Sequence, residues 1–135
     1  MKDKVFLDSN VLVYLYSITE PAKQSVSRKV IAENDCFTSV QALNEFSNVC
    51  LKKWSIGRQS IENAINEICR VCKVAEVGVK TVKSALYLQE KYRYSYYDSL
   101  MLACAIEIGC EQILTEDMHD GQIIESVLKV VNVYK

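Results

Sequence analysis

The sequence predicts an α/β domain in which a parallel sheet of about five strands is flanked by helices. Short apolar runs bounded by turn residues recur along the 135 residues, as expected of strands buried on both faces. Longer segments with apolar residues at helical spacing alternate with them, which is typical of a parallel sheet covered on both sides. Half of the residues are hydrophobic, so residues 1–135 suffice for a single domain with its own core.

The first predicted strand, Val5–Leu7, runs directly into a carboxylate, a hydroxyl and an amide. The carboxylate, Asp8, then lies at the carboxyl end of a buried strand, the edge of an open parallel sheet at which ligands bind. An equally ordinary role for Asp8 or Asn10 is to cap the helix or turn predicted at residues 11–17. A functional role for Asp8 therefore depends on whether other carboxylates reach the same edge.

Further strands and helices follow in alternation. A helix is predicted from Pro21, a residue that suits the first helical position, to about Asn34. The remaining strands are predicted at residues 36–38, 74–77, 112–115 and 130–133.

Two helices are predicted between the second and third strands. Thr38 and Gln41 have the spacing of a capping box, which would open a helix that runs to about Lys53. After a short interruption, the segment from Ile61 has the most regular helical periodicity in the chain. We expect this pair, about residues 39–72, to form an arm or clip beside the sheet.

The second half of the chain contains three more predicted helices. The first carries Val82 and Leu86. The second is capped by Ser95 and is apolar almost all round through residues 100–106, so it is expected to be buried. A short helix is predicted near residues 123–128, before the last strand.

Composition excludes several classes of protein. Sixteen basic and seventeen acidic side chains give a formal net charge of −1, which does not identify a nucleic-acid-binding protein but is compatible with a local basic patch. The six cysteines lack the further ligands of a zinc site and are expected to be reduced thiols. No apolar stretch approaches the roughly 20 residues of a membrane span, and the first is too short for a signal peptide, so a cytoplasmic protein is expected.

Three further acids follow predicted elements in a way that would bring them to the edge of Asp8. Glu45 lies one turn into the helix after the second strand, Asp98 lies in the first turn of the buried helix, and Asp117 follows the fourth strand. Each has an ordinary alternative, namely a solvated helix charge, a capping box with Ser95, and a turn residue, respectively. The joint pattern is what indicates a site.

Four carboxylates in one apolar-walled cleft would repel one another and resist ionisation. A hard divalent cation removes that repulsion, and oxygen ligands without histidine suit Mg²⁺ or Mn²⁺. Such ions activate water and stabilise the charge that develops on a phosphate under attack. The acids therefore indicate metal-dependent hydrolysis of a phosphodiester.

Four segments resemble the motifs of the PIN domain family, in the same order and spacing along the whole chain. They are residues 5–12, 43–46, 97–105 and 113–118. The resemblance implies a PIN-like fold and a Mg²⁺-dependent endoribonuclease. At this length the chain looks like a VapC toxin of a type II toxin–antitoxin (VapBC) pair. It would form a homodimer, cleave RNA, and be inhibited by an antitoxin protein whose tail enters the acidic cleft.

The resemblance also implies roles for individual residues. The acids expected to bind the metal and act in catalysis are Asp8, Glu45, Asp98 and Asp117. Asn10 and Thr115 are expected to orient them. Glu116 and Asp120 lie close enough in the sequence to replace Asp117 as the fourth acid. His119, the only histidine, is expected to be a surface residue, because the family works without a histidine at this place.

An RNA substrate requires positive charge beside the acids. Lys52, Lys53 and Arg58 surround a tryptophan, and Arg93 lies between two tyrosines. Such mixtures of basic and aromatic side chains are typical of contacts to single-stranded RNA. The alternative is that they are solvated residues at helix ends, where basic side chains are favourable.

Two other functions are compatible with the sequence. A PIN nuclease of RNA processing would have the same acids and no antitoxin, and a small upstream reading frame would separate the toxin from it. A catalytically inactive binding module would use the acidic pocket only to dock a partner, which the intact set of four acids argues against.

Overall fold

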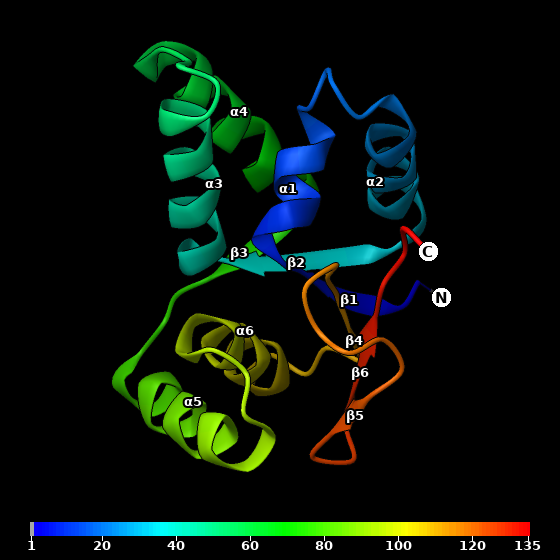
Figure 1. Ribbon diagram of the computed structural model, residues 1–135, viewed down its shortest axis with the longest axis vertical. Coiled ribbons are helices and arrows are strands. Elements are labelled where there is room, and N and C mark those ends of the chain that lie inside the picture. Colours follow the sequence, from blue (N-terminus) through cyan, green and yellow to red (C-terminus); the bar gives the residue numbers. More distant parts are fainter. Residues whose placement is uncertain (1) are drawn as a thin grey trace.

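The computed structural model describes residues 2–135 and contains a six-stranded sheet with the strand order β3–β2–β1–β4–β6–β5 (Figure 1). Five strands are parallel, and β5 runs antiparallel to β6. The predicted α/β class and mainly parallel sheet are thus confirmed, with one more strand than expected. The strands are β1 (Lys4–Leu7), β2 (Asp35–Ser39), β3 (Cys72–Ala75), β4 (Gln112–Leu114), β5 (Ile123–Ile124) and β6 (Leu128–Val131).

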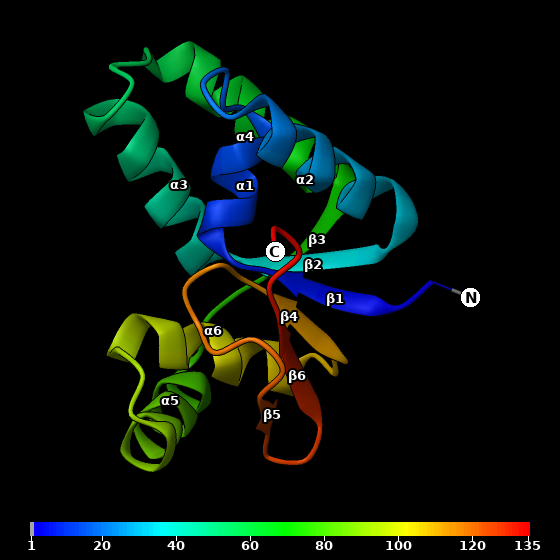
Figure 2. The ribbon, with the colours of Figure 1, turned by 45° about the vertical axis from the view of Figure 1, so that its right-hand side comes forward.

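Helices cover both faces of this sheet. Helices α1 to α4 lie on one face, and α5 and α6 pack together on the other (Figures 1 and 2). Helices α3 and α4 extend away from the sheet and form the arm expected from the sequence (Figure 2). The helices are α1 (Ser9–Leu15), α2 (Pro21–Glu33), α3 (Val40–Lys52), α4 (Arg58–Val71), α5 (Val79–Tyr92) and α6 (Tyr96–Glu107).

The core is built around β1 and α6. The side chains of Val5, Phe6 and Leu7 are at most 1% exposed, because β1 is an inner strand covered on both faces. In α6 every residue from Ser99 to Ala105 is buried, in agreement with its uniformly apolar sequence. Gly109, with φ of +76°, follows the end of α6 in the left-handed conformation that glycine adopts without strain.

The order of the strands reverses between β1 and β4. The chain adds β2 and β3 on one side of β1 and then crosses back to place β4 on the other side. Ligands of open parallel sheets bind at the carboxyl ends of the strands at such a switch point. Asp8 directly follows β1 and Thr115 directly follows β4, so both residues lie there.

The helix predicted near residues 123–128 is wrong. This segment forms β5, a tight turn and the start of β6. Residues 125–127 connect the paired Ile124 and Leu128, and the turn residues Glu125 and Ser126 have φ of 50° and 61°, the positive values of a type I′ turn. Neither is glycine, so the turn has no local sequence signal. It is held by tertiary contacts instead, since the backbone N–H of Glu125 donates to the Tyr92 hydroxyl (N–O 2.9 Å).

Several boundaries also differ from the prediction, among them those of α1, predicted at residues 11–17, and of β6, predicted at residues 130–133. Ser39, rather than Thr38, caps α3 by accepting a hydrogen bond from the backbone N–H of Ala42 (3.2 Å), because β2 continues through Thr38. The third strand begins two residues early, at Cys72, because α4 passes directly into it and Cys72 pairs with Cys36 of β2.

The state of the cysteines and the hydrophobicity of the helices can be compared with the predictions from composition. All six cysteines are free thiols, and all but Cys69 are buried, as predicted. Among the described residues, no helix has the length and apolar character needed to span a membrane.

Candidate active site

Asp8 is the most buried acid of the predicted site, with an exposed fraction of 2%. It caps α1, and its Oδ1 accepts a hydrogen bond from the backbone N–H of Ser9 (2.7 Å). Its Oδ2 accepts one from the hydroxyl of Thr115 (2.7 Å). The backbone N–H of Asp8 donates to the carbonyl of Leu114 (3.1 Å), which continues the pairing of β1 and β4. Asp8 is therefore fixed at the switch point by its neighbours.

Burial raises the pKa of Asp8 from its ordinary value of 3.8 to about 6. The hydrogen bonds from Thr115 and Ser9 lower it, and the charges of Asp98 and Glu45 raise it further. Desolvation is the largest cause, since a buried carboxylate loses contact with water. Burial and the neighbouring acids therefore disfavour the charged form of Asp8, which an added positive charge would stabilise.

Glu45 reaches the same place from the first turns of α3. The hydroxyl of Ser9 lies 3.4 Å from its Oε1 and 3.5 Å from Oδ1 of Asp8, so one side chain bridges both acids. The amide of Gln41 donates to the other carboxylate oxygen (3.3 Å). Burial raises the pKa of Glu45, and the charges of Asp98 and Asp117 raise it further.

Asp98 comes from the first turn of α6, on the opposite face of the sheet. The hydroxyl of Ser95 accepts a hydrogen bond from the backbone N–H of Asp98 (3.1 Å) and so begins the helix at this point, as predicted. The side chain is half-buried. Burial raises its pKa, and the charge of Asp117 adds to the effect.

Asp117 is the exposed member of the group and lies in the loop after β4. The side-chain amide of Asn10 donates to its Oδ2 (3.0 Å), and its backbone N–H donates to the hydroxyl of Thr115 (3.1 Å). Thr115 thus contacts both Asp8 and the backbone of Asp117. The two polar residues expected to orient the acids make these contacts.

The two alternative candidates for the fourth acid are engaged elsewhere. Glu116 accepts hydrogen bonds from Tyr14 and Lys23. Asp120 accepts one from the backbone N–H of Asn132 (2.8 Å), which is the largest cause of its lowered pKa. Asp117 alone of the three affects the ionisation of Glu45 and Asp98.

The four acids fit a hard cation by their chemistry, although they are not arranged as a ready-made cage. Within residues 2–135, no group of three histidine, cysteine or acidic side chains meets the geometry of a metal site. All the donors are oxygens, as Mg²⁺ prefers, and the pKa values of three of the acids are raised by burial and, to a smaller extent, by the charges of neighbouring acids. Asn10 Oδ1 and Ser99 Oγ, each next to one of these acids, are buried without a hydrogen-bond partner.

The predicted RNA-binding residues lie in two separate places. Lys52, Lys53 and Arg58 are exposed at the far end of the arm, where Arg58 donates to Glu62 of the same helix. Arg93 is exposed, with φ of 65°, in the linker between α5 and α6 that leads to Asp98. His119 is exposed, as expected.

Sequence reasoning missed three residues that contact the site or its neighbours. Ser9 bridges Asp8 and Glu45, and Tyr14 and Lys23 bind Glu116. The four-residue spacing of Asn10 and Tyr14 places both on one face of α1, which is a usable signal. The contact of Lys23 with Glu116 joins residues that are 93 positions apart, and no local sequence pattern indicates it.

A family model matches the sequence of the chain, and several solved structures have a similar fold. A family model described as the PIN domain matches residues 5–119. No curated protein matches the chain. The fold is similar to that of a toxin–antitoxin complex from Klebsiella pneumoniae, at 21% sequence identity and a TM-score of 0.70, covering 97% of this chain and 98% of that one.

Two further solved structures have a similar fold. VapBC2 from Rickettsia felis, bound to a DNA fragment from its promoter, is 13% identical with a TM-score of 0.68, covering 96% of this chain and 99% of that one. VapC20 from Mycobacterium tuberculosis, described as a sarcin–ricin loop cleaving toxin, is 19% identical with a TM-score of 0.63, covering 81% and 86%. At these identities the similarity is one of fold.

The raised pKa of Asp8 predicts how the stability of the metal-free protein depends on pH. The folded chain holds this proton more tightly than the unfolded chain, so its contribution favours folding at low pH and is lost as the pH rises from about 4 to about 6. Asp8→Asn should therefore stabilise the protein in EDTA by about 3 kcal/mol at pH 7.5, with the gain shrinking toward pH 4.

Thermal unfolding of both proteins in EDTA from pH 4 to 7.5 measures this difference. Asp120→Asn is the matched control. Its carboxylate is stabilised in the folded state, so this change should lower the melting temperature at pH 7.5. A stability difference for Asp8→Asn that does not vary with pH would contradict the account of Asp8.

Proposed function

The chain belongs to the PIN domain family, and from this premise we propose that it is a Mg²⁺-dependent endoribonuclease and the toxin of a toxin–antitoxin pair. The observation that carries the proposal is the convergence of four carboxylates from four separate segments, close enough to affect one another's ionisation. A purely structural role does not account for this, because burying like charges together destabilises the fold.

In this proposal Asp8, Glu45, Asp98 and Asp117 hold a Mg²⁺ ion, with Mn²⁺ as a substitute. When bound, the ion supplies a Lewis acid for attack on a phosphodiester. The protein holds the carboxylates in position. Thr115 and the backbone N–H of Ser9 fix the Asp8 carboxylate, and Asn10 fixes that of Asp117.

RNA is the proposed substrate. One of the similar folds is described as a sarcin–ricin loop cleaving toxin, which supports this class of substrate. A surface depression of about 670 Å³ is lined by residues that include Arg93, Tyr94 and His119, and His119 follows Asp117 by two residues. Arg93 lies in the linker that leads to Asp98, and its charge is proposed to contact a phosphate of the RNA.

The walls of this depression are joined by hydrogen bonds. The Tyr94 hydroxyl accepts a hydrogen bond from the backbone N–H of His119 (2.9 Å) and donates one to the side chain of Gln122. The linker that carries Arg93 is thus tied to the loop that carries the fourth acid. A phosphate contact made by Arg93 would therefore keep a fixed position relative to the acids.

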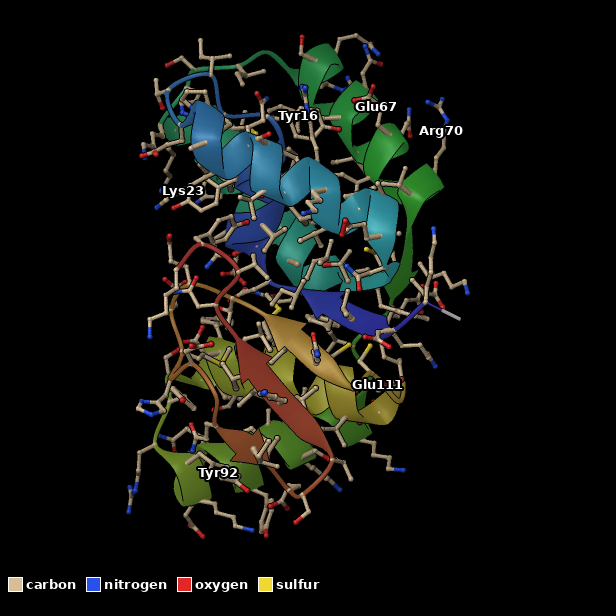
Figure 3. All side chains as sticks on the ribbon, turned by 90° about the vertical axis from the view of Figure 1, so that its right-hand side faces the viewer. Tyr16, Lys23, Glu67, Arg70, Tyr92 and Glu111 are labelled. Carbon is tan, nitrogen blue, oxygen red and sulfur yellow. The ribbon has the colours of Figure 1, made fainter. Side chains whose placement is uncertain are left out.

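An antitoxin and a second copy of the chain are the proposed protein partners. Two of the similar structures are described as VapBC or toxin–antitoxin complexes, which supports the antitoxin. A groove of about 470 Å³ is lined mainly by α3 and α4 of the arm, and Phe46, Ile61, Glu67 and Tyr16, the residue after α1, are among its lining residues. Tyr16 and Glu67 lie close together at this groove in Figure 3. Its mixed apolar and polar lining suits a segment of a partner protein.

Asp98→Asn should lower the rate of RNA cleavage by about a hundredfold or more, because it removes one charged ligand of the metal ion. The fold should be retained, because the site is surface-accessible. Cleavage of a panel of fluorescent RNAs, including structured ones, would be measured in Mg²⁺, Mn²⁺ and EDTA. Asp120→Asn, whose carboxylate is engaged with Asn132, should remain active. Mg²⁺-dependent cleavage retained by Asp98→Asn would refute the assignment of the site.

Arg93→Ala should weaken RNA binding and reduce the slope of log affinity against log salt by about 0.7, as expected for one phosphate contact on a single strand. Binding would be measured in the Asp98→Asn background to prevent cleavage. Lys83→Ala, which removes an exposed cation of α5, is the control and should leave the slope unchanged. Changing both Lys52 and Lys53 to alanine tests whether the end of the arm contacts RNA. An unchanged slope for Arg93→Ala would exclude that contact.

A further inference from the structure

Glu116 is held in a small network that the proposed chemistry does not use. Its Oε1 accepts a hydrogen bond from the Tyr14 hydroxyl (2.5 Å), and its Oε2 pairs with the ammonium of Lys23 (2.7 Å). Lys23 also donates to the Tyr14 hydroxyl (3.1 Å). Each of the three side chains thus contacts the other two, although they come from α1, α2 and the loop after β4.

The partners of Glu116 distinguish it from Asp8, Glu45 and Asp98. Burial would raise its pKa, but the hydrogen bonds from Lys23 and Tyr14 outweigh this and lower it below the ordinary value. The pKa values of Asp8, Glu45 and Asp98 are all raised. Glu116 is therefore an ion-paired carboxylate and does not share the charge repulsion of its neighbours.

The C-terminal segment closes the network from outside. The ring of Tyr134 packs edge-on against that of Tyr14, with 5.0 Å between their centroids, and the Tyr134 hydroxyl is hydrogen-bonded to Ser27 of α2 (2.6 Å). The ammonium of Lys23 lies 4.8 Å from the centroid of the Tyr14 ring. In Figure 3 Lys23 projects from α2 on the side of this C-terminal segment. These contacts restrict the movement of both Tyr14 and Lys23.

Helix α1 holds the loop after β4 at two consecutive residues. Asn10 binds Asp117, and Tyr14, one helical turn further, binds Glu116. The Asn10 contact is the only side-chain hydrogen bond to the Asp117 carboxylate among the described residues. The backbone of this loop has other bonds, but the Asp117 carboxylate itself depends on Asn10, and the ion pair at the adjacent residue adds a second link between the loop and the helices α1 and α2.

We propose that Tyr14, Lys23 and Glu116 form a clamp whose role is to position Asp117 in the acidic site. The proposal rests on the proposed function, since a position for Asp117 matters only if that residue contributes to ion binding. The three are positioning residues, which act through Asp117 and do not touch the ion or the RNA.

The test measures Mn²⁺ affinity by electron paramagnetic resonance in a double-mutant cycle. Tyr14→Phe removes one hydroxyl and should weaken Mn²⁺ binding by about tenfold, the usual effect of losing a group that orients a ligand. Tyr16→Phe is the matched control. The Tyr16 hydroxyl binds Glu67 of the arm at 2.8 Å, so its loss should leave the affinity unchanged (Figure 3). In the Asp117→Asn background, Tyr14→Phe should have no further effect.

A second measurement keeps the clamp separate from the proposed function. The side-chain amide signals of Asn10 in ¹⁵N–¹H spectra of the metal-free protein report its bond to Asp117, and they should shift in Tyr14→Phe and not in Tyr16→Phe. If the wild type bound no Mn²⁺, the proposed function would fail while the Asn10 signals still decided the clamp. Unchanged Asn10 signals in Tyr14→Phe, or a loss of affinity that adds to that of Asp117→Asn, would overturn the clamp.

Discussion

Burying a carboxylate at the end of a central strand costs free energy, and the elements around Asp8 are arranged in ways that offset part of this cost. The hydroxyl of Thr115 and the backbone N–H of Ser9 each donate a hydrogen bond to it. Because Thr115 follows β4, the first of these bonds also joins the carboxyl ends of the two strands at the switch point. The two bonds do not restore the ordinary pKa, because the effect of burial outweighs them.

Helix α1 is the element that connects Asp8 to the rest of the site. It begins at Asp8, its first residue Ser9 lies between Asp8 and Glu45, and Asn10 reaches the loop after β4. One turn further, Tyr14 holds Glu116 in the same loop. A single seven-residue helix therefore sets the relative positions of three of the four acids. The fourth, Asp98, depends on the buried helix α6, whose first turn is fixed by Ser95.

The sequence predicts local features well where chain-local physics decides them. The apolar strand before Asp8, the uniformly apolar α6 and the cap at Ser95 all follow from spacing and residue type, and so do the positions of Asp8, Glu45 and Asp98 on their elements. Features decided by distant contacts were not predicted. The hairpin at Glu125 and Ser126 needs Tyr92, and the pairing of Lys23 with Glu116 joins α2 to a loop 93 residues away. The choice of Asp117 over Glu116 as the acid facing the site depends on that same pairing.

The central claim is that the four carboxylates share one hard cation, and anomalous scattering from crystals grown with Mn²⁺ tests it most directly. We expect a strong anomalous peak among Asp8, Glu45, Asp98 and Asp117, and we expect it to be lost when Asp98 is changed to asparagine. A peak only at other residues, or none at saturating Mn²⁺, would contradict it. In that case the buried charge of Asp8 would require another explanation.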